Sequence, residues 1–216
     1  MTKNVPVSVT PPLCGDLVLD AMRIAEWAHR TRYRKGGPHY RKAPEGKDRP
    51  SYFLHLAQVA WMLEFAQLDA QTVAAGYLHD TFEDTTLSPE ELLQMIGDTR
   101  VVVVIEHVTE PPKAEDETGD WEKRNVAYLD RVRTAPREAI ALSCADKTSN
   151  LIDFTLLMRE GHSIESFASR GFAVQLQKFE KLAEIFRAAD IPAGLKGRFE
   201  GALRDFRAAG ERLSRL

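Results

Sequence analysis

The sequence predicts an all-α protein with a single domain, and three observations support this fold class. Apolar residues recur at helical spacing along most of the chain, beginning with Leu17, Ala21 and Ile24. Ser88 is followed by a proline at N1 and a glutamate at N3, which together form a capping box at a helix start. The β-branched run 101–105 favours a strand, but no second strand is available to pair with it, so we assign it to a helix.

The expected helix boundaries follow from capping residues and from glycines and prolines. The first helix begins after Asp16 and runs to about Arg34, where the glycines and proline at 36–38 end it. Asp69 is the expected N-cap of a helix that extends through Leu78. Residues 1–14 are expected to form an irregular leader and residues 15–216 one helical domain. Further helices are expected from about residue 52 through 65, from 89, and at 121–133, 136–158, 164–188 and 194–214, with loops at 36–50 and 110–120.

The composition excludes several classes of protein. The chain has 216 residues, of which 44% are apolar and 28% charged, and a formal net charge of −3. This profile is typical of a soluble globular domain and does not favour a stable nucleic-acid complex. Cys14 and Cys144 form no disulfide framework, the N-terminus lacks a signal-peptide layout, and no apolar run approaches the roughly 18 residues of a membrane span. We therefore expect a cytoplasmic protein, compatible with a homodimer, that does not bind membranes.

One imidazole and three carboxylates crowd the end of an apolar helical segment. His79 and Glu83 are four residues apart, as are Asp80 and Asp84, so a continuous helix would place each pair on a shared face. Like-charge repulsion makes such a cluster of acids unfavourable unless a cation compensates it. The segment therefore predicts a metal-dependent site.

Two further donors complete a candidate ligand set. His55 and Asp146 join His79 and Asp80, and two histidines with two aspartates suit Mn²⁺, Fe²⁺, Co²⁺ or Zn²⁺. Four protein ligands leave coordination positions for water and substrate, as catalysis requires. Each residue taken alone also fits a structural role: His55 at the edge of the core, and Asp146 at the end of a solvated face.

The spacing of these residues resembles a known family. His55, then the His79-Asp80 pair, then Asp146 in an Ala-Asp-Lys-x-x-Asn context, is similar to the H…HD…D signature of the HD superfamily of helical-bundle phosphohydrolases. Residues 78–85, LHDTFEDT, resemble the corresponding segment of RelA/SpoT-type alarmone hydrolases, which act on ppGpp in the stringent response. A Val-Thr pair at 108–109 also matches that group. The resemblance covers roughly residues 17–157.

The resemblance implies a role for each matching residue. His55, His79, Asp80 and Asp146 would hold one divalent ion, with Mn²⁺ the first choice and Fe²⁺, Co²⁺, Zn²⁺ or Mg²⁺ as alternatives. Catalysis would fall to two acids that handle the attacking water, Glu83 and Asp84. The substrate would be a nucleotide, and Asn150 would contact it. The implied activity is a guanosine 3′,5′-bis(diphosphate) 3′-pyrophosphohydrolase.

A basic segment leads directly into His55. Between residues 30 and 49 eight lysines and arginines face only two acids, which gives about +6 in a chain with a total of −3. Such a rim suits a polyanionic substrate, because arginines make bidentate contacts with phosphate. The residues expected to bind substrate here are Arg41, Lys42, Lys47, Arg49 and Tyr52. A charged run is also what a solvated surface loop contains.

The same segment departs from the alarmone hydrolases and leaves other functions open. Residues 47–49 are inserted, Leu56 replaces the usual proline, and Arg32 replaces a glutamine. One alternative is an HD hydrolase of another nucleotide or phosphate ester, such as a dNTP, a nucleoside monophosphate, a cyclic nucleotide or NADPH. The other is a non-catalytic nucleotide-binding HD module, although such a module would not require Glu83 and Asp84 in addition to the four ligands.

Overall fold

The computed structural model describes residues 10–33, 50–110 and 120–213 of the chain. Within these ranges the regular structure is helical, apart from an isolated antiparallel bridge between Tyr33 and Ser51, so the predicted all-α class is confirmed. No helix in the described ranges is long and apolar enough to cross a membrane. The helices in chain order are α1 (Leu17–His29), α2 (Phe53–Phe65), α3 (Ala70–Leu78), α4 (Thr81–Asp84), α5 (Pro89–Ile96), α6 (Thr99–Val108), α7 (Asp120–Thr134), α8 (Arg137–Arg159), the 3₁₀ turn η1 (Ile164–Ser166), α9 (Phe172–Ala188) and α10 (Ala193–Leu213).

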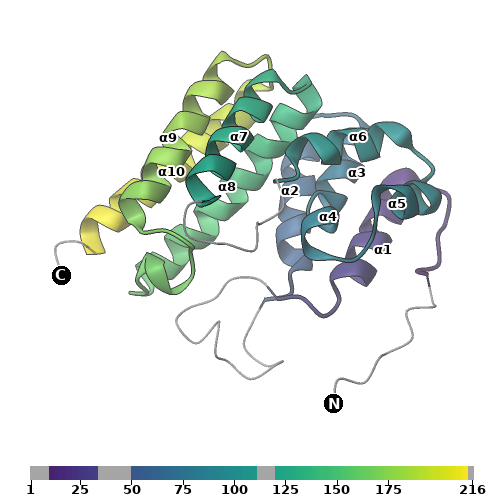
Figure 1. Ribbon diagram of the computed structural model, residues 1–216, viewed down its shortest axis with the longest axis horizontal. Helices are drawn as coiled ribbons and strands as arrows, with labels where there is room; N and C mark the ends of the chain where they lie inside the picture. Colours follow the sequence, from purple (N-terminus) through teal and green to yellow (C-terminus); the bar gives the residue numbers. More distant parts are fainter. Residues whose placement is uncertain (1–9, 34–49, 111–119, 214–216) are drawn as a thin grey trace.

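The long helix α8 joins the two sides of the molecule. Helices α7 to α10 gather on one side and α1 to α6 on the other, and α8 packs against α10 on its own side and against α2, α3 and α6 across the middle (Figure 1). Its residues from Ala139 to Asp146 are all buried, as expected for a helix surrounded by other helices. Asp146 is therefore fixed between the two halves.

Helices α2 and α3 approach closely because α3 carries a glycine where they meet. A Cβ atom at Gly76 would lie 2.7 Å from Leu63 Cδ1 and 3.0 Å from Ala60 Cα. Both of these α2 residues are buried, so a side chain at Gly76 would have to displace packed core atoms. The close approach places the rings of His55 and His79 with their centroids 5.1 Å apart.

Local capping residues begin the helices where the sequence predicts them. The Asp16 side chain accepts hydrogen bonds from two backbone N–H groups of α1, and Asp69 caps α3 through the N–H of Thr72. Ser88 and Glu91 form the expected capping box at the start of α5. The β-branched run 101–105 lies within α6, so its assignment to helix is confirmed.

Two predicted helices are shorter than expected. The first ends at His29 rather than near Arg34, because the backbone turns there: the N–H of Arg32 donates to the carbonyl of His29. The predicted helix 164–188 divides into η1 and α9. Ile164 of η1 and Phe167, which directly follows η1, pack into the core. The α-helix restarts only after Gly171.

Candidate metal centre

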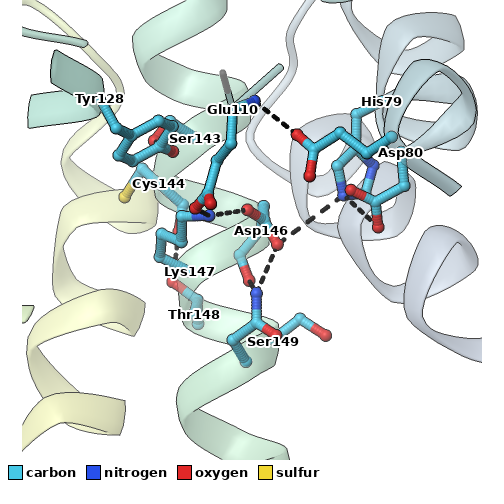
Figure 2. A network of polar contacts seen from close by, with 12 residues as sticks. His79, Asp80, Glu110, Tyr128, Ser143, Cys144, Asp146, Lys147, Thr148 and Ser149 are labelled. Atoms are coloured by element: carbon cyan, nitrogen blue, oxygen red, sulfur yellow. Dashed lines mark hydrogen bonds and ion pairs between the residues drawn. The ribbon is translucent and has the colours of Figure 1, made fainter. Parts of the chain in front are cut away.

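The structure brings together the four residues that the sequence singles out as candidate metal ligands. His55 comes from α2, Asp146 from α8, and His79 and Asp80 from the junction of α3 and α4. Asp146 Oδ1 lies 3.3 Å from His55 Nε2 and 3.7 Å from His79 Nε2. Asp80 Oδ2 lies 3.4 Å from His55 Nε2 and 3.3 Å from His79 Nε2. Figure 2 shows three of the four, with the carboxylates of Asp80 and Asp146 pointing towards the His79 ring.

The helix that begins after Asp69 ends at Leu78, as predicted, so His79 and Asp80 lie between two helices and not within one continuous helix. Helix α3 ends at Leu78, and Asp80 has φ −91° and ψ 3° before the single turn of α4 begins. Asp84 still follows Asp80 by one turn, because its N–H donates to the Asp80 carbonyl over 2.9 Å. Glu83, in contrast, accepts a 2.6 Å hydrogen bond from the backbone N–H of Glu110.

Hydrogen bonds fix both imidazoles with Nε2 directed at the carboxylates. His79 Nδ1 lies 2.9 Å from the Gly76 carbonyl, which can only accept, so Nδ1 carries a proton. His55 Nδ1 lies 2.8 Å from Ser149 Oγ, and Ser149 donates its own hydrogen to Gln58 Oε1 over 2.8 Å. Ser149 Oγ therefore accepts from His55. Nε2 is then the ring atom that can bind a cation when each ring is neutral, and the Nδ1 partners orient the rings.

The electrostatics of the cluster fit a divalent cation. His79 Nε2 is buried and has no well-aligned hydrogen-bond partner among the described residues. Burial alone lowers the pKa of His79, but the adjacent Asp80 and Asp146 carboxylates outweigh burial and raise this pKa to about 9. Burial also opposes ionisation of Asp80, yet the two imidazoles keep the pKa of Asp80 well below its usual range. A group of His55, His79 and Asp80 offers ligand atoms within 4.8 Å of one another.

A cavity of about 520 Å³ adjoins the cluster. Three of its lining residues also contact the candidate ligands: Tyr52 donates to Asp80 Oδ2 over 2.6 Å, Asn150 donates to Asp146 Oδ1 over 2.6 Å, and Lys147 Nζ lies 2.8 Å from Asp146 Oδ2. Tyr52 and Asn150, predicted to bind substrate, therefore lie at the cavity and also hold the two aspartates in place. The charged residues that line it are Arg32, Arg124, Lys147, Lys178, Glu83, Asp84 and Glu110.

The two predicted catalytic acids line this cavity but have different surroundings. Burial of the carboxyl group is the larger cause and the negative charge of Asp80 the second, and together they raise the pKa of Glu83 to about 8. Asp84 lies at the rim, with Oδ1 4.0 Å from Arg32 Nη1. Glu83 is therefore the acid whose protonation changes near neutral pH, as a general base requires.

Several cavity residues escape sequence reasoning because they come together only in three dimensions. Glu110 Oε1 lies 3.3 Å from Lys178 Nζ and 3.8 Å from Lys147 Nζ. Lys147 also forms an ion pair with Asp146, as Figure 2 shows. The Val-Thr pair before Glu110 marks its neighbourhood, but nothing in the sequence connects Glu110 to Lys178 on α9. Ser149, which accepts from His55 rather than lining the cavity, is likewise not marked by any motif.

Four of the predicted substrate-binding residues, Arg41, Lys42, Lys47 and Arg49, lie outside the described residues. The chain on either side of them is described: Tyr33 and Ser51 pair with each other, and the Tyr52 N–H donates to the Arg32 carbonyl over 3.1 Å. Arg32, Tyr33 and Tyr52 line the cavity. The basic segment therefore leaves and rejoins the described structure at the cavity.

A family model described as "HD domain" matches residues 37–174, which include all four candidate ligands. The chain belongs to the HD-domain family. Two solved structures have a similar fold. The HD-domain protein has a TM-score of 0.69, at 20% sequence identity, to a metazoan SpoT orthologue described as hydrolysing ppGpp, with 91% of this chain and 97% of that chain covered. It has a TM-score of 0.61, at 27% identity, to a protein of Listeria monocytogenes EGD-e, with 74% and 97% covered.

Curated relatives of this HD-domain protein are named for alarmone metabolism. A guanosine-3′,5′-bis(diphosphate) 3′-pyrophosphohydrolase of Borreliella burgdorferi is 27% identical over 141 residues, which are 65% of this chain and 19% of that protein. The bifunctional (p)ppGpp synthase/hydrolase SpoT of Escherichia coli K12 is 30% identical over 120 residues, which are 51% of this chain and 16% of that protein. The chain thus spans less than a fifth of the length of these relatives.

Proposed function

We propose that this HD-domain protein is a metal-dependent phosphohydrolase that converts guanosine 3′,5′-bis(diphosphate) to GDP and pyrophosphate. The observation that carries the proposal is the convergence of two imidazoles and two ionised carboxylates at the edge of a cavity lined by four basic side chains. The names of the relatives supply the substrate.

The proposal gives the four clustered residues the role of metal ligands, with Mn²⁺ as the ion. His55 and His79 would bind through Nε2, and Asp80 and Asp146 through carboxylate oxygens. Such an ion polarises a phosphate oxygen and lowers the pKa of water. Ser149, Tyr52 and Asn150 keep these ligands in place through the hydrogen bonds that they make to His55, Asp80 and Asp146.

Glu83 would accept the proton of the attacking water, and Asp84 at the rim of the cavity would help to orient that water. Water attacks the phosphorus that is bound to ribose O3′, the P–O3′ bond breaks, and O3′ takes a proton, which yields GDP and pyrophosphate. The backbone N–H of Glu110 holds Glu83 in the cavity during this step. Arg41, Lys42, Lys47 and Arg49 belong to the proposal as phosphate-binding residues, since the segment that contains them joins the described chain at the cavity.

Turnover of ppGpp by protein stripped with a chelator and then reloaded with Mn²⁺ tests the proposal. We expect release of pyrophosphate and GDP, no turnover without metal, and no turnover by Asp80→Ala. Asp130→Ala, an exposed aspartate of α7 outside the cavity, is the matched control and should keep full activity. Cleavage of a dNTP, NADPH or a cyclic nucleotide with ppGpp left intact would assign another substrate, and a loaded protein that binds nucleotides without cleaving any would be a binding module.

A further inference from the structure

Lys178 places a nearly buried ammonium group in the cavity from the C-terminal part of the chain. Its side chain is 12% exposed, and Nζ lies 3.3 Å from Glu110 Oε1 and 5.4 Å from the centroid of the Tyr128 ring. Burial lowers the pKa of Lys178, and the Glu110 carboxylate opposes this effect only in part. A lysine in this position is costly for the fold unless an anion offsets its charge.

Glu110 is the ion-pair partner of two lysines. The same Glu110 oxygen lies 3.8 Å from Lys147 Nζ, and both lysines lie over the ring of Tyr128, with Lys147 Nζ 4.7 Å from its centroid. Lys147 is firmly paired elsewhere, because Asp146 Oδ2 is 2.8 Å from its Nζ. Two ammonium groups thus share one carboxylate, and Lys178 is the one whose only ion pair among the described residues is the shared one.

Lys178 is separated from Asp146, one of the candidate ligands, by Glu110 and Lys147, which link the two through three ion pairs. Gln175, one turn earlier on α9, is buried and lines the cavity. Trp121, Phe154 and Phe167 add aromatic surface to the same cavity. A cationic group, an amide and flat apolar surfaces suit a ligand that combines a phosphate with a planar ring.

We propose that Lys178 binds a phosphate of the nucleotide that is not cleaved, namely the 5′-diphosphate when the 3′-diphosphate lies at the candidate metal ligands. In the complex the substrate phosphate would replace Glu110 as the ion-pair partner of Lys178, and Glu110 would stay paired with Lys147. This proposal rests on the proposed function for the identity of the nucleotide. It gives α9 a part in substrate specificity, in addition to its place in the helical packing.

Steady-state kinetics of three variants on substrates with and without 5′-phosphates test the proposal. For Lys178→Gln we expect KM for ppGpp to rise about tenfold to a hundredfold, as for the loss of a charged hydrogen bond, while kcat changes less than about threefold. Lys178→Arg should recover most of the affinity. Lys181→Gln, at an exposed position of the same helix, is the matched control and should equal the parent protein.

Guanosine 3′-diphosphate, which lacks 5′-phosphates, separates substrate binding from a structural role. On this substrate Lys178→Gln and the parent protein should have the same KM, because the group that Lys178 binds is absent. An equal loss on both substrates, or a KM for ppGpp unchanged from that of Lys181→Gln, would overturn the proposal. Unfolding temperature and Mn²⁺ content of each variant establish that the comparison is made between folded, loaded proteins.

The role of Lys178 can be tested even if the proposed function is wrong. If the loaded parent protein does not cleave ppGpp, the proposed function fails. Calorimetric titration with inorganic pyrophosphate then tests the anion subsite directly. Weaker binding by Lys178→Gln than by Lys181→Gln would support an anion subsite at Lys178, and equal binding by the two variants would overturn it.

Discussion

Lowering the pH from 8 to 6.5 is expected to weaken Mn²⁺ binding because His79 must lose a proton before its Nε2 can bind a cation. The carboxylates of Asp80 and Asp146 raise the pKa of His79 to about 9 in the metal-free protein. Below that pKa each unit of pH costs about tenfold in affinity for one displaced proton, so the apparent Kd should rise at least about 30-fold across this interval.

Isothermal titration calorimetry in two buffers of different ionisation enthalpy measures both the Kd and the protons released. We expect at least one proton per bound ion, and a second contribution from Glu83, whose pKa of about 8 a nearby cation would lower. Glu83→Gln removes that contribution and should leave about one proton released per bound ion. His107→Gln, at a histidine outside the cluster, is the control. A Kd that changes less than about threefold between pH 6.5 and 8 would refute the reasoning.

The same titration has a consequence for the stability of the metal-free protein. Because the folded pKa of His79 lies above the ordinary 6.5, its stabilisation is complete below pH 6.5 and is lost as the pH rises towards 9. Between pH 6.5 and 8 the loss is about 2 kcal/mol, and the raised pKa of Glu83 acts in the same direction. The unfolding temperature of chelated protein should therefore fall across this interval, and a constant or rising value would contradict the assignment.

Three substitutions test the surroundings of the cluster. Ser149→Ala removes the acceptor of His55 Nδ1 and should raise the Kd for Mn²⁺ about tenfold to a hundredfold, measured by metal titration, and should cost about 1–3 kcal/mol of unfolding free energy because a buried N–H loses its partner; Ser163→Ala, outside the cluster, should have no such effect on the Kd. Glu83→Gln should keep its metal but lose at least about 10²-fold in kcat, and normal turnover would make Glu83 structural. Gly76→Ala should cost about 1–3 kcal/mol of unfolding free energy in a urea titration, because its Cβ would meet buried α2 atoms.

The four residues that lie together could be singled out from the sequence because they belong to short local patterns. The His79-Asp80 pair precedes two acids at helical spacing, and Asp146 is followed one turn later by Asn150. The orientation of the two imidazoles could not be predicted. His79 donates to the Gly76 carbonyl, and Gly76 lies close enough to α2 to place His79 beside His55.

The sequence by itself determined the fold class, the helix starts and the four candidate metal ligands, because capping, apolar spacing and the His-Asp pattern are local properties of the chain. The tertiary structure alone decided which side chains complete the cavity and which support the candidate ligands. Glu110 meets Lys178 across 68 residues of sequence, and Ser149 meets His55 across 94. Such pairs are fixed by how α9 and α2 pack around α8, and helix packing depends on the fit of whole surfaces, for which no single residue type is a marker.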